Sequence, residues 1–149
     1  MTNNTTLYDK LSLLKEFEDY ILKDKGHGLP ASIFSYELSP LESSVKFLIE
    51  NKGMGFSEAG KILNRDRRVI WTTYKRASGK MPGPFKISSA IIIPASILGS
   101  EENTVAEQLV VYMHEILGMK LAQIASVTGR SMRTLQTLYR RALHRRGEK

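Results

Sequence analysis

The chain has no cysteine among its 149 residues, which excludes disulfides, thiolate zinc sites and thiol nucleophiles. Its three histidines, His27, His114 and His144, do not have the spacing of metal ligands. No stretch approaches the roughly 18 apolar residues of a membrane span, and the first residues lack the pattern of a signal peptide. Glycine-rich phosphate loops and nucleophile–base motifs are also missing. We therefore expect a cytoplasmic, non-enzymatic protein that needs no cofactor and no metal and does not enter a membrane.

The chain does contain the same pattern twice. The segment 29–34 (LPASIF) returns as 93–98 (IPASIL), and Gly53-Met54 returns as Gly118-Met119 after one inserted residue. The tails of the two copies then align, with Arg65, Arg68, Thr72, Tyr74, Arg76 and Ala77 matching Arg130, Arg133, Thr137, Tyr139, Arg141 and Ala142. Such a self-alignment predicts a duplicated module. We divide the chain into an N-terminal helix (1–28), a first repeat (29–80), a linker (81–92) and a second repeat (93–149).

Positive charge is concentrated in the second half of each repeat. The net charge of the whole chain is +7, but residues 52–80 carry +6 and residues 116–149 carry +7, whereas residues 1–51 and 81–115 carry −3 each. Two basic blocks in matching positions indicate two contact surfaces for a polyanion such as nucleic acid.

The N-terminal segment is predicted to be an amphipathic helix over residues 5–25. Leu7, Leu11, Leu14, Phe17 and Ile21 recur at helical spacing and form one apolar stripe, while the outer face is acidic. Two interpretations remain open at this point. The helix is either a brace packed on the first repeat or a surface for homodimerisation.

Three helices are predicted in each repeat, which gives an all-α fold. In the first repeat, Ser39, Pro40 and Glu42 form a capping-box pattern at the start of a long helix. Ser57 is expected to cap a short helix over 58–63, and Asp66 a third helix that ends near residue 78. The second repeat is expected to have helices over 104–117 and 121–127 and a last one after Ser131 that reaches residue 146. Residues 29–34 and 91–93 are predicted to be docking straps, one for each repeat.

The second repeat has the pattern of a helix-turn-helix over residues 121–142. Ala125 is small where the second helix must cross closely, and Gly129 permits the positive φ that the turn needs. Ser131 then starts the second helix, and Leu135 supplies a buried aliphatic side chain at the crossing. This stretch resembles the helix-turn-helix of sigma factor region 4 and of related response-regulator output domains. The first repeat has Gly60 and Asn64 in the slots of Ala125 and Gly129, and both are compatible with the motif.

Helical geometry sorts the last helix of each repeat into an inward and an outward face. The inward positions are Ile70, Thr73, Tyr74 and Ala77 in the first repeat and Leu135, Leu138, Tyr139 and Ala142 in the second. In the family that the motif resembles, outward residues of this helix reach base edges in the major groove and flanking basic residues hold phosphates. The resemblance thus implies a DNA-binding set of Arg65, Arg67, Arg68, Trp71, Thr72, Lys75, Arg76, Arg130, Ser131, Arg133, Gln136, Thr137, Arg140 and Arg141.

Individual roles within this set stay open between two interpretations. Arg68 and Arg133 are suited to guanine and Gln136 to adenine, but an arginine in such a position also serves as a solvated or phosphate-bound side chain. Trp71 is predicted to face outward, where it would touch a thymine methyl group or the sugar–phosphate wall. The alternative is a slightly rotated helix that places Trp71 in the core.

The outward faces of the two repeats are unlike, because Arg67, Trp71 and Lys75 stand where Met132, Gln136 and Arg140 stand. We therefore predict a regulator of transcription that binds double-stranded DNA at an asymmetric site, with its two heads about one helical turn apart. Residues 63–77 are also similar to tandem helix-turn-helix regulators of archaea such as the archaellum regulator of methanogens, which would imply a promoter-bound activator. The alternative hypothesis is an interaction module that contacts RNA polymerase or another basal transcription factor.

Overall fold

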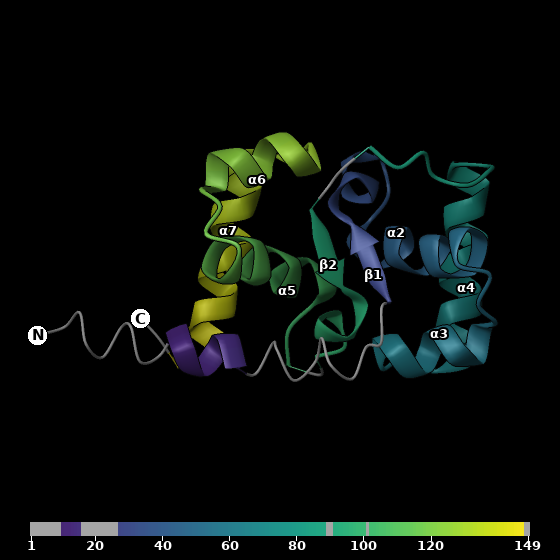
Figure 1. Ribbon diagram of the computed structural model, residues 1–149, viewed down its shortest axis with the longest axis horizontal. Helices are drawn as coiled ribbons and strands as arrows, with labels where there is room; N and C mark the ends of the chain where they lie inside the picture. The colour runs from purple at the N-terminus through teal and green to yellow at the C-terminus, as the bar shows by residue number, and fades with distance from the viewer. Residues whose placement is uncertain (1–9, 16–26, 89–90, 101, 148–149) are drawn as a thin grey trace, which may run out of the picture.

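The computed structural model describes residues 10–15, 27–88, 91–100 and 102–147, and it is mostly helical (Figure 1). The same order of elements occurs twice. The first half consists of β1 (Gly28–Pro30), η1 (Ala31–Ser35), α2 (Pro40–Lys46), η2 (Phe47–Asn51), α3 (Phe56–Leu63) and α4 (Arg67–Lys80). The second half consists of β2 (Ile92–Pro94), η3 (Ala95–Leu98), α5 (Val105–Val111), η4 (Tyr112–Ile116), α6 (Leu121–Thr128) and α7 (Met132–Arg145). The all-α expectation holds apart from the short strands.

The predicted helices are found with small shifts of their ends. The 3-10 turns η1 and η3 follow the strands, and η2 and η4 are single π-helical turns that extend α2 and α5. One predicted start was wrong, because Gly55 and not Ser57 is the N-cap of α3. The last helix ends at Arg145 rather than at residue 146. These differences are of the size expected when helix ends are predicted from capping residues alone.

Only residues 10–15 of the predicted N-terminal helix lie within the described part of the chain, and they are helical. Leu7, Phe17 and Ile21, which complete the predicted apolar stripe, lie outside the described residues. Leu11 and Leu14 expose 55% and 43% of their surface, whereas Leu13 packs against the core. Both the brace and the homodimerisation surface stay predictions.

A capping box begins the first long helix of each half. The hydroxyl of Ser39 accepts a hydrogen bond from the Glu42 amide at 3.1 Å, and the Glu42 carboxylate accepts one from the Ser39 amide at 2.9 Å. Thr104 and Glu107 form the same pair of bonds at 3.1 and 3.3 Å. Both glutamates are buried and each pairs with the basic residue at the end of the half's last helix. Lys80 lies 3.1 Å from Glu42, and Arg145 lies 3.1 Å from Glu107.

The straps join the two halves to each other. β1 and β2 pair antiparallel, with Gly28 opposite Pro94 and Leu29 opposite Ile93. The turn after each strand then packs on the other half, η1 against α6 and η3 against α3. Helices α2 and α5 also contact each other between the two halves. Each strap therefore has neighbours in both halves, which the sequence did not indicate.

Buried side chains of both halves belong to the same hydrophobic cluster. Phe34 of η1 and Leu98 of η3 are fully buried, as are Leu48 and Met113. A module of about fifty residues is close to the lower limit at which a core supports itself. Because η1 packs on α6 and η3 packs on α3, the two halves form one larger core. These contacts also fix the position of α4 relative to α7.

Candidate nucleic-acid interface

The turn between α6 and α7 has the backbone that the motif requires. Gly129 has φ of +68°, and its amide bonds to the Ala125 carbonyl at 2.9 Å, which ends α6. The Ser131 hydroxyl then accepts a hydrogen bond from the Thr134 amide at 3.1 Å and begins α7. Ile124 and Leu135 are fully buried at the crossing of the two helices. The predicted turn and cap of the second half are therefore confirmed.

The turn between α3 and α4 reaches the same geometry with other residues. Asn64 has φ of +54°, the left-handed conformation that asparagine tolerates better than most residues. The Asp66 carboxylate accepts a hydrogen bond from the Arg68 amide at 2.8 Å and caps α4. A Cβ added to Gly60 would lie 2.6 Å from the carbonyl oxygen of Arg65, so this turn approaches its first helix too closely for alanine. The turn that contains Asn64 therefore needs a residue without a side chain at position 60.

The inward faces of α4 and α7 are the predicted ones. Ile70, Thr73 and Ala77 are buried in the first half, as are Leu135 and Ala142 in the second. The half-buried tyrosines are held by carboxylates of the preceding π-helical turns. Tyr74 donates to Glu50 and Tyr139 donates to Glu115, both at 2.9 Å. The bond to Glu50, together with burial, raises the pKa of the Tyr74 hydroxyl above its ordinary value.

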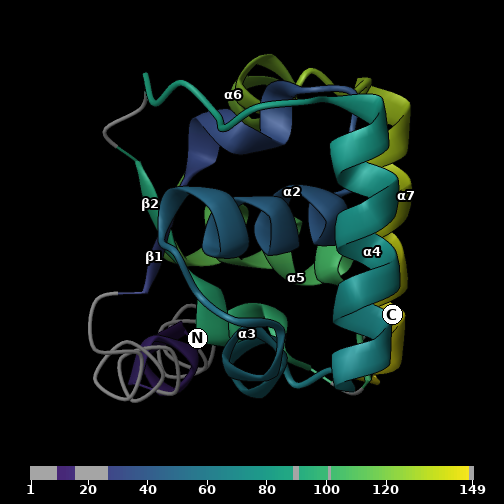
Figure 2. The ribbon, with the colours of Figure 1, turned by 90° about the vertical axis from the view of Figure 1, so that its right-hand side faces the viewer.

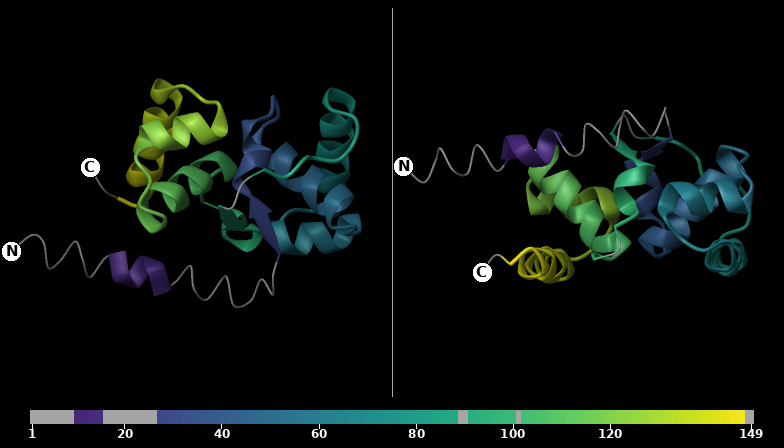
Figure 3. Two further views of the ribbon diagram at one scale, coloured as in Figure 1. Left: turned by 45° about the horizontal axis from the view of Figure 1, so that its top comes forward. Right: turned by 90° about the horizontal axis from the view of Figure 1, so that it is seen from below.

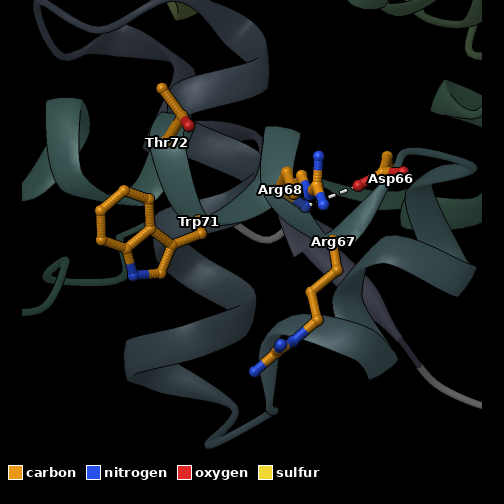
Figure 4. A pocket seen from close by; sticks show the side chains of 5 residues that line it. All are labelled: Asp66, Arg67, Arg68, Trp71 and Thr72. Atoms are coloured by element: carbon orange, nitrogen blue, oxygen red, sulfur yellow. Dashed lines mark hydrogen bonds between the residues drawn. The ribbon is translucent and has the colours of Figure 1, made fainter.

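These inward contacts leave a polar and cationic face of α4 exposed. All the predicted residues of this helix are exposed, namely Arg67, Arg68, Trp71, Thr72, Lys75 and Arg76. Asp66, Arg67, Arg68, Trp71 and Thr72 line a shallow hollow along the start of the helix, and Figure 4 shows Trp71 and Arg67 projecting away from the ribbon. Trp71 exposes 49% of its surface and the Lys75 ammonium lies 5.6 Å from the centre of its ring. The outward interpretation of Trp71 is therefore confirmed, and the core interpretation is wrong.

The corresponding face of α7 is also exposed. Ser131, Arg133, Gln136, Arg140 and Arg141 are exposed, and Thr137 is half-buried. Arg140 and Arg141 line a second hollow with His144 and Arg145, toward the end of the helix. The predicted set did not include His144 and Arg145, although the basic tail of the sequence was a signal for them. The exposed cationic surface thus extends further along α7 than predicted.

The two remaining residues of the predicted set, Arg65 and Arg130, lie in the turns and are half-buried. Arg65 donates to the Leu63 carbonyl at 3.1 Å and to the Asn64 carbonyl at 3.2 Å. Arg130 donates to the carbonyl of Leu38 in the other half at 3.0 Å. Both guanidinium groups therefore donate hydrogen bonds to backbone carbonyls next to the start of the exposed helices α4 and α7.

Helices α4 and α7 lie on one face of the molecule and run in opposite directions. In Figure 2 they stand one behind the other at the right-hand edge, and in the right panel of Figure 3 both are seen end-on at the lower edge. The helical residues 10–15 lie on the opposite side in these views. The two helices that carry the exposed cationic residues therefore lie antiparallel on one face of the molecule.

The described residues contain neither a metal-binding cluster nor a membrane-spanning helix. Over 10–15, 27–88, 91–100 and 102–147, no group of three His, Asp or Glu residues is placed to hold a metal ion. No helix in that part of the chain is long and apolar enough to cross a bilayer. The exposed arginines and lysines of α4 and α7 offer hydrogen-bond donors and positive charge, which suit phosphates and the acceptor edges of bases.

Residues 104–145 match the family model of sigma-70, region 4. The match begins at the cap of α5 and ends at the last residue of α7, so it covers less than a third of the chain. No curated protein and no solved structure matches the chain. The second half thus carries a helix-turn-helix like that of sigma factor region 4, as its motif predicted. This match supports a role of this half in DNA binding and transcription.

Proposed function

We propose that the protein is a sequence-specific DNA-binding regulator of transcription with two helix-turn-helix domains, one in each half. The observation that carries this proposal is the placement of two exposed cationic helices on one face, one of which belongs to a sigma-70 region 4 match. In this proposal α4 and α7 are the recognition helices and the DNA lies across the face that they share. Promoter-bound activation, cytoplasmic location and the asymmetry of the site belong to the same proposal.

The residues of the two recognition helices divide into two stripes. Positions 68, 72 and 76 of α4 carry Arg, Thr and Arg, and the equivalent positions 133, 137 and 141 of α7 carry the same three residues. Positions 67, 71 and 75 carry Arg, Trp and Lys, whereas 132, 136 and 140 carry Met, Gln and Arg. Residues four apart lie on one side of a helix, so the identical and the unlike residues form two neighbouring rows.

This division supports separate roles for the rows. Contacts to phosphates do not depend on the base sequence of the DNA. The row that is identical in both helices therefore suits contacts to the DNA backbone and to any base that the two half-sites have in common. Side chains that differ between the helices suit base edges that differ between the half-sites. We assign the difference in specificity to Arg67, Trp71 and Lys75 in one head and to Met132, Gln136 and Arg140 in the other.

The affinity for duplex DNA tests the proposal. Neutralising about 6–10 phosphates predicts a loss of about 10³–10⁵ in affinity between 50 and 200 mM salt. A double variant Arg68→Ala, Arg133→Ala removes one arginine from each recognition helix and is expected to weaken binding to a selected site by about 30- to 10⁴-fold, from about 1–3 kcal/mol for each of the two contacts. Lys10→Ala, Lys15→Ala makes the same change of net charge on the side opposite α4 and α7, and it serves as the matched control. Equal losses in the two double variants, or a flat salt profile, would count against the proposal.

An interaction with RNA polymerase or another basal transcription factor is the second candidate function. A specific observation favours it for the first half, where two apolar side chains of α4, Val69 and Trp71, expose 42% and 49% of their surface. Exposed apolar side chains of this kind are enriched at protein interfaces. Retention of purified polymerase by the full chain, lost in Val69→Ala, Trp71→Ala while DNA affinity is unchanged, would favour this function for α4.

A further inference from the structure

Contacts between the two halves occur in reciprocal pairs. The Ala31 amide donates to the Ile91 carbonyl at 2.9 Å, and the Ala95 amide donates to the His27 carbonyl at 3.0 Å. In the self-alignment Ala31 is equivalent to Ala95 and His27 to Ile91, so the second bond is the first with the two halves exchanged. The antiparallel pairing of β1 and β2 has the same property.

The turns before the recognition helices repeat this reciprocity. The Asn64 side chain of one turn donates to the carbonyl of Gly99, the residue that follows η3, at 3.0 Å. Its equivalent, Gly129, lies against η1, where a Cβ added to the glycine would be 3.4 Å from the Ser35 carbonyl. Ser35 and Gly99 are equivalent positions. Each turn thus rests on the end of the other half's strap.

Reciprocal contacts define the symmetry that relates the halves. An interface in which residue i contacts j and the equivalent of j contacts the equivalent of i is isologous, and it arises from a two-fold rotation. A head-to-tail relation would pair unlike surfaces and would not exchange the roles of the straps. The opposite directions of α4 and α7 on one face agree with a two-fold axis that passes between them (Figures 1 and 2).

We infer that the two half-sites on DNA lie in opposite orientations, an inference that rests on the proposed function. Duplex DNA has its own two-fold axes perpendicular to the helix, and operator symmetry follows the symmetry of the protein that reads it. Two heads related by a two-fold rotation therefore meet half-sites on opposite strands. We call Arg67, Trp71 and Lys75 of α4, and Met132, Gln136 and Arg140 of α7, the reading rows. The site is a pseudo-palindrome with two unlike halves, because the fold is two-fold symmetric whereas the two reading rows differ.

Variants with matching heads test this orientation directly. The substitutions Arg67→Met, Trp71→Gln and Lys75→Arg give α4 the reading row of α7, and all three positions are exposed. The opposite set, Met132→Arg, Gln136→Trp and Arg140→Lys, gives α7 the row of α4, so one set remains informative if the other unfolds. Sites are selected from random duplex DNA with each variant and with the unmodified chain, and their consensus sequences are compared.

The expected result is a consensus that reads the same on both strands for each matched variant. We also expect each matched variant to bind its selected palindrome at least about 10-fold more tightly than a direct repeat of the same half-site. This should hold for every distance between the repeated half-sites, varied base pair by base pair through one helical turn. A direct-repeat consensus, or a single half-site, overturns the inference and leaves DNA binding by the chain intact. Failure of the unmodified chain to enrich any sequence overturns the proposed function itself, and the inference with it.

Discussion

The two halves of the molecule share an inward framework and differ in their turns and in one outward row. Tyr74 and Tyr139 are bonded to equivalent glutamates, and the capping boxes at Ser39 and Thr104 are alike. The left-handed turn residue, in contrast, is asparagine in one half and glycine in the other. Buried contacts and caps thus fix the position of the last helix in each half, and one row of its exposed side chains differs between the halves.

The sigma-70 region 4 match separates the halves more sharply than the backbone does. It covers the second half alone, although α3 and α4 repeat the arrangement of α6 and α7. The first half departs in the two slots that most define the motif, Gly60 and Asn64. Both turns nevertheless contain a left-handed residue, with φ +54° and ψ 50° at Asn64 and φ +68° and ψ 16° at Gly129.

The largest expected effect comes from the straps. Phe34→Ala removes a fully buried ring from η1 and is expected to lower the free energy of unfolding by about 3–5 kcal/mol. Because η1 packs on α6, amide hydrogens of α6 should exchange faster in this variant, although the substitution lies in the first half. Leu98→Ala is the equivalent variant of the second half, and it should make the amide hydrogens of α3 exchange faster, because η3 packs on α3. Loss of protection confined to the mutated half would contradict the shared core.

The crossing slots of the two turns are expected to prefer different residues, glycine at position 60 and alanine at position 125. Gly60→Ala places a Cβ against the Arg65 carbonyl and should destabilise the protein by about 1–3 kcal/mol, despite the higher helix propensity of alanine. Ala125→Gly has no such clash to relieve and should cost about 1 kcal/mol from propensity alone. Denaturant unfolding of both variants measures the contrast. A stabilised Gly60→Ala variant would show that the turn of the first half is not as close as described.

A smaller, pH-dependent effect is expected at Glu42. Burial alone would raise the pKa of this carboxyl group, but bonds from the Ser39 amide and Lys80 outweigh it and leave the pKa below its ordinary value. A lowered pKa stabilises the fold above the unfolded pKa of about 4.3, and this contribution is lost as the pH falls through the folded value. Glu42→Gln should therefore cost about 1 kcal/mol at pH 7, and this cost should shrink as the pH falls below about 4. A pH-independent difference in urea midpoint between the two proteins would contradict this.

The smallest effect on stability is expected at the exposed reading rows. Trp71→Ala and Gln136→Ala should each change the free energy of unfolding by no more than about 0.5 kcal/mol, because both side chains are exposed. The two variants should, however, change DNA recognition in different half-sites. Each variant should relax base preference in one half-site only, which site selection would show. If both variants relax the same base positions, the assignment of one half-site to each helix is wrong.

Local features of this fold could be predicted from the sequence, whereas contacts between its halves could not. The caps at Ser39, Asp66 and Ser131 and the left-handed Asn64 and Gly129 follow from residue types within one turn of chain. The inward and outward faces of α4 and α7 follow from helical periodicity. Strand β1 is three residues long and contains Pro30, so it carries no alternating pattern, and its pairing with β2 depends on residues more than sixty positions away. The orientation of the two candidate sites depends on that pairing.

Selection of bound sites from random duplex DNA by the unmodified chain tests the central claim most directly, since site length and symmetry report on both heads together. Two recognition helices with unlike reading rows predict an enriched site with two different half-sites, about one helical turn apart. The absence of any enriched sequence, or a site built from two copies of the same half-site, would contradict the account.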